Sequence, residues 1–370
     1  VFATFKASAQ ETFPVLGIPY RHDLTYVFKN ASIHTDHKTV IDSATLIVKT
    51  GVIEAIGKNL AVPAGSIVQD LKGMHVYASF IDPFSHYGIS GNEKDKLDSG
   101  DGRRSPQPSS NTKGAYSWNE ALKPEIEGHR LFVANEEVAN KMRNAGFGMV
   151  LSLPRDGIAR GSGCVVLLGT GKENELLVRE KAASTFSFNK GSSKQEYPTS
   201  EMGAIALLRQ SFLDADWYAN GGYKEERNIS IQAWIDNRKL PMIFESSNYL
   251  QALRIDKIGD EFGANFIIKG SGDEYKRSDE ISKTGNTYVL PLRFPEAYNV
   301  SDPFDAQSLT LEDLMNWEQA PLNAITLEKK GVRIAFTSTG LKDVETFTEQ
   351  LRLLHSLGMS KESLLKAVTE

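Results

Sequence analysis

The sequence predicts an α/β protein: a parallel sheet or barrel of strands and helices, preceded by a small β-sheet. Residues 24–72 alternate polar and apolar side chains in short runs, which is typical of β-strands. Beyond residue 75, short apolar runs alternate with stretches of helical periodicity, and this alternation indicates a parallel sheet or barrel. The length of 370 residues suits a (β/α)8 barrel with an appended sheet.

The N-terminal part divides into a tail and a sheet. We assign residues 1–22 to a tail and 23–75 to the sheet. Its strands are expected to pair mostly antiparallel, because the runs are short and most end at Gly, Asn or Pro. The predicted strands are 24–28, 44–48, 51–57 and 66–71.

Residues 76–370 are assigned to the barrel. Several of its predicted strands follow Gly or Pro, and they are 76–81, 147–153, 164–168, 242–244, 265–268, 288–290 and 333–336, with 182–188 as a further candidate. The predicted helices are 131–145, 200–219, 247–262, 343–357 and 360–369. In 247–262 the apolar stripe is Ile255, Ile258 and Phe262, and Ser246, Ser247 or Asn248 can cap the helix.

The clearest loop is 90–118, which is rich in Ser, Gly, Asn, Asp and Pro. It follows the first barrel strand, and barrels of this class keep their active sites at that face. We expect a disordered insertion, with a mobile lid as the alternative.

Composition excludes several functional classes. The net charge is −5, with acids and bases interspersed, so no basic block indicates nucleic-acid binding. No apolar run approaches the roughly 20 residues that a membrane-spanning helix needs. The single cysteine, Cys164, allows no intrachain disulfide and is expected to be a buried, unreactive thiol.

The N-terminal tail carries a possible export signal. Ala7-Ser8-Ala9 matches the small-x-small end of a secretory signal sequence. This pattern predicts a periplasmic or secreted location, and a chance run of small residues is the alternative.

The first predicted barrel strand ends in Asp82-Pro83-Phe84-Ser85-His86. This segment resembles the Asp-x-His-x-His motif of the amidohydrolase superfamily, with Phe84 in place of the first metal-binding histidine. The approach at 70–73, the segment at 318–323, the strand at 331–340 and the C-terminal segment 357–370 are similar to imidazolonepropionase-like and other metal-dependent members. The resemblance implies a TIM-like (β/α)8 barrel with a partial N-terminal β-sandwich.

The same resemblance places further replacements at metal-binding positions. Glu245, in Pro-Met-Ile-Phe-Glu-Ser, stands where a family strand carries a histidine, and Lys269 stands at the next histidine. Thr339 falls at the essential aspartate. The predicted pocket residues are therefore Asp82, Phe84, His86, Glu245, Lys269 and Thr339, and none of them is assigned a catalytic role.

A catalytic zinc site generally uses three protein ligands and one open position. Only His86 and Glu245 could contribute here, so no metal cofactor is expected. If 242–244 and 265–268 are adjacent strands, Glu245 and Lys269 can form an ion pair in the vacated site. Two solvent-facing charges are the alternative.

The Gly-rich stretch from Arg155 to Gly163 could bind an anion through backbone N–H groups, although it lacks the Lys-Ser/Thr end of a P-loop. A packing or turn role is the simpler interpretation.

Three functions remain open. The first is a non-catalytic structural or interaction domain of a larger exported hydrolase, partnered by the rest of a longer chain or by a second amidohydrolase domain. The family's final strands are not found before Glu370, which favours that fragment hypothesis. The second is an active hydrolase of C–N bonds that binds zinc or another divalent metal through His86, Glu245 and further ligands. The third is a module that binds a small molecule in the old pocket.

Overall fold

The computed structural model describes residues 24–89 and 107–370. They form two compact units that divide between Ala78 and Ser79. The predicted boundary at residues 75 and 76 lies three residues earlier. Ala7-Ser8-Ala9 and most of the predicted loop 90–118 fall outside the described residues.

The first unit is a five-stranded sheet of order β3-β2-β1-β4, in which β5 also pairs with β1. Its core contains Ala31, Ile33, Ala44 and Leu46. The expectation of an antiparallel sheet holds only in part, because β4 and β5 run parallel to β1. The strands are β1 (Thr25–His34), β2 (Val40–Lys49), β3 (Val52–Gly57), β4 (Ile67–Asp70) and β5 (His75–Val76).

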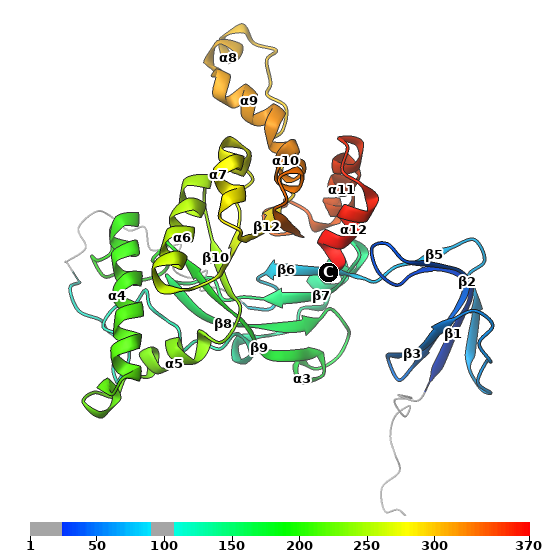
Figure 1. Ribbon diagram of the computed structural model, residues 1–370, viewed down its shortest axis with the longest axis horizontal. Helices are drawn as coiled ribbons and strands as arrows, with labels where there is room; N and C mark the ends of the chain where they lie inside the picture. Colours follow the sequence, from blue (N-terminus) through cyan, green and yellow to red (C-terminus); the bar gives the residue numbers. More distant parts are fainter. Residues whose placement is uncertain (1–23, 90–106) are drawn as a thin grey trace, which may run out of the picture. The chain divides into compact units, whose positions relative to one another are not determined.

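The second unit is built on an eight-stranded sheet of order β13-β12-β11-β10-β9-β8-β7-β6 (Figure 1). The predicted apolar runs all fall in or beside these strands. The direction of one strand was not predicted, because β8 runs antiparallel to both of its neighbours. The strands are β6 (Phe80–Ser85), β7 (Phe147–Ser152), β8 (Ala159–Leu167), β9 (Leu177–Ser187), β10 (Met242–Glu245), β11 (Phe266–Lys269), β12 (Thr287–Pro291) and β13 (Arg333–Thr337).

The two end strands of this sheet are joined by side chains. The hydroxyl of Thr337, the last residue of β13, donates to the carbonyl of Phe84 on β6 at 2.7 Å. The inner face is apolar and contains Phe84, Leu153, Ala183, Ile243 and Val289. The sheet therefore encloses a packed interior, as the inward-facing side chains of a barrel do.

Helices follow most of the strands. Asn248 caps α6 by accepting a hydrogen bond from the backbone N–H of Gln251, and Ile255 and Ile258 are buried as predicted. The helices are α1 (Gly128–Leu131), α2 (Glu136–Asn144), α3 (Glu173–Leu176), α4 (Glu201–Ala219), α5 (Ile229–Asn237), α6 (Tyr249–Phe262), α7 (Ser278–Lys283), α8 (Pro303–Ser308), α9 (Leu311–Gln319), α10 (Asn323–Lys329), α11 (Phe347–Ser356) and α12 (Lys361–Thr369), with 3-10 turns η2 (Gly222–Lys224), η3 (Glu274–Arg277), η4 (Ala320–Leu322) and η5 (Val344–Thr346).

Helices α3, α5, α7, α8, α9 and α10 were not predicted, and of these α8 and α9 contain no buried residue. Helices α8 and α9 extend outward from the rest of this unit in Figure 1. Among the residues described, no helix is both long and apolar enough to cross a membrane.

Candidate functional site

Glu245 and Lys269 meet at the ends of two adjacent strands. Glu245 closes β10 and Lys269 closes β11, and the two residues are register partners in the parallel ladder. Lys269 Nζ lies 3.8 Å from Glu245 Oε1. The ion pair predicted from the sequence is therefore present in the structure.

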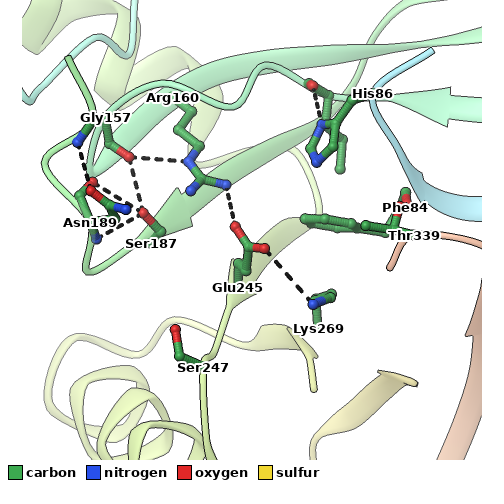
Figure 2. A network of polar contacts seen from close by, with 12 residues as sticks. Phe84, His86, Gly157, Arg160, Ser187, Asn189, Glu245, Ser247, Lys269 and Thr339 are labelled. Carbon is green, nitrogen blue, oxygen red and sulfur yellow. Dashed lines mark hydrogen bonds and ion pairs between the residues drawn. The ribbon is translucent and has the colours of Figure 1, made fainter. Parts of the chain in front are cut away.

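Arg160 is the closer partner of Glu245 (Figure 2). Its Nη1 donates to Glu245 Oε2 at 2.7 Å, and its Nε donates to the carbonyl of Gly157 at 3.1 Å. The Arg160 side chain is only 6% exposed. The sequence analysis named the glycine-rich stretch around this residue but did not connect Arg160 with Glu245.

A local backbone irregularity accompanies Arg160. The β8–β9 ladder shifts register between Ala159 and Ser162, and Gly161 has φ +87°. A Cβ on Gly161 would lie 2.0 Å from the carbonyl oxygen of Ile126, so only glycine fits at this close approach. Such a bulge re-aims neighbouring side chains. Closely spaced glycines in a strand pattern were the one sequence signal that pointed to it.

The charges in this cluster influence one another. Burial alone would raise the pKa of Glu245, but Arg160 and then Lys269 outweigh it and hold the pKa below its ordinary value. Burial lowers the pKa of Lys269, and Glu245 offsets part of that effect. The Glu245 carboxylate is thus ionised and shared between two cations.

Phe84 is completely buried and belongs to the apolar layer inside the sheet. Lys269 Nζ lies 5.9 Å from the centre of the Phe84 ring, within cation–π range. The backbone carbonyl of Phe84 accepts hydrogen bonds from the hydroxyls of Thr337 and Thr339, the latter at 2.5 Å. Phe84 therefore forms an apolar floor beside the Arg160–Glu245–Lys269 cluster.

His86 also packs against the ring of Phe84. The two rings pack edge to face, with centroids 5.2 Å apart. His86 Nδ1 lies 2.8 Å from the carbonyl oxygen of Leu153, so Nδ1 carries the proton and donates it. Burial lowers the pKa of His86 to about 4, which keeps the ring neutral at physiological pH.

Asp82 is buried inside the sheet, which differs from the pocket position predicted for it. It is fully buried, and its Oδ2 accepts hydrogen bonds from the N–H and hydroxyl of Ser338 at 3.0 and 2.5 Å. Its Oδ1 accepts from the N–H of Phe84 at 3.0 Å. Asp82 therefore joins β6 to the residues after β13, and burial raises its pKa.

Three of the six predicted pocket residues line two separate cavities. The first, of about 370 Å³, is lined by Glu245 and Arg160 together with Arg155, Ser187, Phe188, Asn189, Glu201, Ser247 and Gln251. The second, of about 480 Å³, is lined by His86 and Thr339 among others. Phe84 and Lys269 are not among the lining residues of either cavity.

Comparison with solved structures gives this arrangement a context. An amidohydrolase from Thermotoga maritima MSB8 superposes with a TM-score of 0.68 at 21% identity, over 93% of this chain and 86% of that one. The chain has the amidohydrolase fold. A β-aspartyl dipeptidase from Fervidobacterium islandicum AW-1 matches with a TM-score of 0.46 at 14% identity, over 93% and 85% of the two chains. No protein-family model and no curated protein matches the sequence.

The amidohydrolase fold confirms the predicted barrel with an N-terminal β-rich domain. The resemblance inferred from the segment ending in His86 is thus confirmed as a statement about fold. Within residues 24–89 and 107–370, no group of three or more His, Cys, Asp or Glu side chains is placed to hold a metal ion.

Proposed function

We propose that this chain is a non-catalytic domain of the amidohydrolase fold, in which an Arg160–Glu245–Lys269 cluster stands in place of a metal centre. The observation that carries the proposal is the double engagement of Glu245. Its Oε2 accepts from Arg160 at 2.7 Å, and its Oε1 lies 3.8 Å from the Lys269 ammonium.

The donor set does not fit a divalent cation. Phe84 has no lone pair to offer, and Thr339 offers a neutral hydroxyl, which donates its hydrogen to the Phe84 carbonyl, in place of a carboxylate. Two cations, Arg160 and Lys269, would repel a metal ion at Glu245, and this repulsion is strong where water is largely excluded. A catalytic zinc site needs about three protein ligands.

The competing hypothesis is an active hydrolase that binds metal through His86 and Glu245. Those two residues line different cavities, and Phe84 packs against His86 on the side of the cluster. No observation on the described residues favours this alternative.

Metal analysis of the purified chain tests the proposal. After dialysis against metal-free buffer, we expect zinc, manganese, iron, cobalt and nickel each far below one ion per chain. Stoichiometric metal that survives dialysis would overturn the proposal. The same result must hold after incubation with excess zinc, which excludes loss of a weakly bound ion during purification.

A partner for the domain and its location stay predictions. A non-catalytic domain of this fold fits beside a catalytic amidohydrolase domain, in the same chain or in another. The exported location rests on Ala7-Ser8-Ala9 alone.

A further inference from the structure

We propose that the 370 Å³ cavity binds a small organic carboxylate, whose carboxylate group pairs with the guanidinium of Arg155. This inference rests on the proposed function, because it takes the Arg160–Glu245–Lys269 cluster as a permanent part of the cavity wall. It adds the chemical class of the ligand.

Arg155 is an exposed cation without a partner among residues 24–89 and 107–370. It lines the cavity, yet no carboxylate of the described residues lies within 4 Å of its side chain and none accepts a hydrogen bond from it. By contrast, Arg160 is held by Glu245 and Gly157. A guanidinium presents a fork of N–H donors that matches a carboxylate, so Arg155 is the free recognition group of this cavity.

The charge around the cavity favours an anion. Arg155, Arg160 and Lys269 are cationic, and Glu245 is the one carboxylate set among them. The other acidic lining residue, Glu201, is already neutralised, since Arg254 forms an ion pair with it and Gln251 donates to it. Positive charge therefore remains in excess.

The field of Arg155 extends across the site. Burial is the main cause of the lowered pKa of His86, and Arg155 lowers it further. The pKa of Lys269 is also lowered, mainly by burial and in smaller part by Arg160 and Arg155. An anion at Arg155 would thus be attracted by the whole cluster.

The walls select the kind of anion. Phe188 offers a ring that is itself packed against Phe244, with centroids 4.7 Å apart, so it is a fixed apolar surface. The cavity volume is at the lower end for small-molecule sites. Glu245 would repel the second charge of a phosphate dianion. These features together favour a compact monocarboxylate whose body can lie on the Phe188 ring.

The test compares benzoate with benzamide, which has nearly the same shape but no charge. Both are titrated into the full chain at constant ionic strength, and binding is followed by calorimetry and by the unfolding temperature, which a native-state ligand raises. We expect saturable binding of benzoate and none of benzamide.

Two variants locate the site. Arg155→Gln removes the positive charge of this side chain. We expect the affinity for benzoate to fall about tenfold or more, because a charge-assisted hydrogen bond is lost. Arg333→Gln is the matched control, because Arg333 is also exposed but begins β13 and is not among the lining residues of this cavity. Arg155 is exposed, so the ligand-free unfolding temperature of Arg155→Gln should equal that of the wild type.

The outcomes separate the two proposals. The ligand assignment would be overturned if the metal-free protein bound neither probe, or if benzoate still bound to Arg155→Gln. Neither result would affect the proposed function. Inorganic phosphate that binds more tightly than benzoate and depends on Arg155 would overturn the carboxylate class. Stoichiometric zinc in the same sample would overturn the proposed function whatever the probes do.

Discussion

Arg160 donates to Glu245 at 2.7 Å, so a bulged residue of β8 anchors the carboxylate that ends β10. Lys269 approaches the other oxygen of the same carboxylate from β11. The pair predicted from the sequence is thus one side of a three-residue cluster, and its stability depends on the strand that runs antiparallel to the others.

The first prediction concerns Glu245. Glu245→Gln leaves Arg160 and Lys269 side by side without a counter-charge, and breaking a largely buried pair in this way costs about 3 kcal/mol of unfolding free energy. Glu261→Gln is the control, since Glu261 pairs with Arg209 on the surface and should cost less than about 1 kcal/mol. Urea unfolding measures both. Equal, near-zero effects would show that the cluster contributes nothing to stability.

The second prediction concerns the bulge. Gly161→Ala brings a methyl group against the carbonyl of Ile126 and also strains a backbone with φ +87°. We expect a loss on the order of 3 kcal/mol or more. Gly331→Ala has a similar φ of +78° but no atom within 4 Å, so it should lose only the backbone strain of about 1 kcal/mol. Equal losses of unfolding free energy in the two variants would show that the close approach of Gly161 to Ile126 does not stabilise the bulge.

The third prediction is a pH dependence. The pKa of His86 is about 4 in the folded protein and 6.5 in an unperturbed chain, so the folded state binds the proton more weakly. This contribution to stability is complete above pH 6.5 and is lost as the pH falls toward 4, to a total of roughly 3 kcal/mol. His86→Gln, which keeps a donor for the Leu153 carbonyl, should show a shallower loss of stability over that range. An NMR titration midpoint of His86 near 6.5 would contradict the prediction.

The fourth prediction tests the role found for Asp82. Asp82→Ala removes the acceptor shared by Ser338 and Phe84 and leaves buried donors unsatisfied, at a cost of about 3 kcal/mol. Asp82→Asn keeps one acceptor oxygen, so it should lose less than Asp82→Ala, although its amide N–H2 cannot accept from the donors that pair with the other oxygen. Thermal unfolding of the two variants measures the difference. Equal losses would mean that the charge of Asp82, rather than its hydrogen bonds, joins the strands.

The sequence predicted the parts of the fold that depend on local pattern. The runs at β7 and β10–β13 are short and apolar, and they were found at nearly their true bounds. The direction of β8 was missed because strand direction is decided by long-range pairing. Helices α8 and α9 were missed for another reason: they bury no residue, so no apolar stripe marks them strongly.

In the candidate site, only the contact between side chains on neighbouring strands could be predicted from the sequence. Glu245 and Lys269 follow adjacent apolar runs, so their pairing required only that those strands be neighbours. Arg160 lies 85 residues before Glu245 and reaches it beside a bulge, which no local pattern specifies. Asp82 was misplaced for a similar reason, since its partner Ser338 is 256 residues away.

The last prediction asks what excludes a metal. Phe84→His alone supplies a second imidazole next to His86, but Arg160 and Lys269 still pair with the carboxylate of Glu245. We therefore expect no stoichiometric zinc in this variant after incubation and dialysis. Replacing the cations as well, in Phe84→His/Arg160→Met/Lys269→His, frees Glu245 and adds a third imidazole, and this variant should retain more zinc than any single one.

Elemental analysis measures the zinc, and circular dichroism checks that each variant is folded. Phe336→His, at an equally buried phenylalanine of β13 outside the cluster, controls for metal bound by a disordered chain. One zinc per chain in the folded Phe84→His variant would show that Phe84 alone excludes the metal and that the cations do not. If the folded triple variant retained no more zinc than Phe84→His, the cation cluster would not be what keeps the metal away, because removing both charges would have changed nothing.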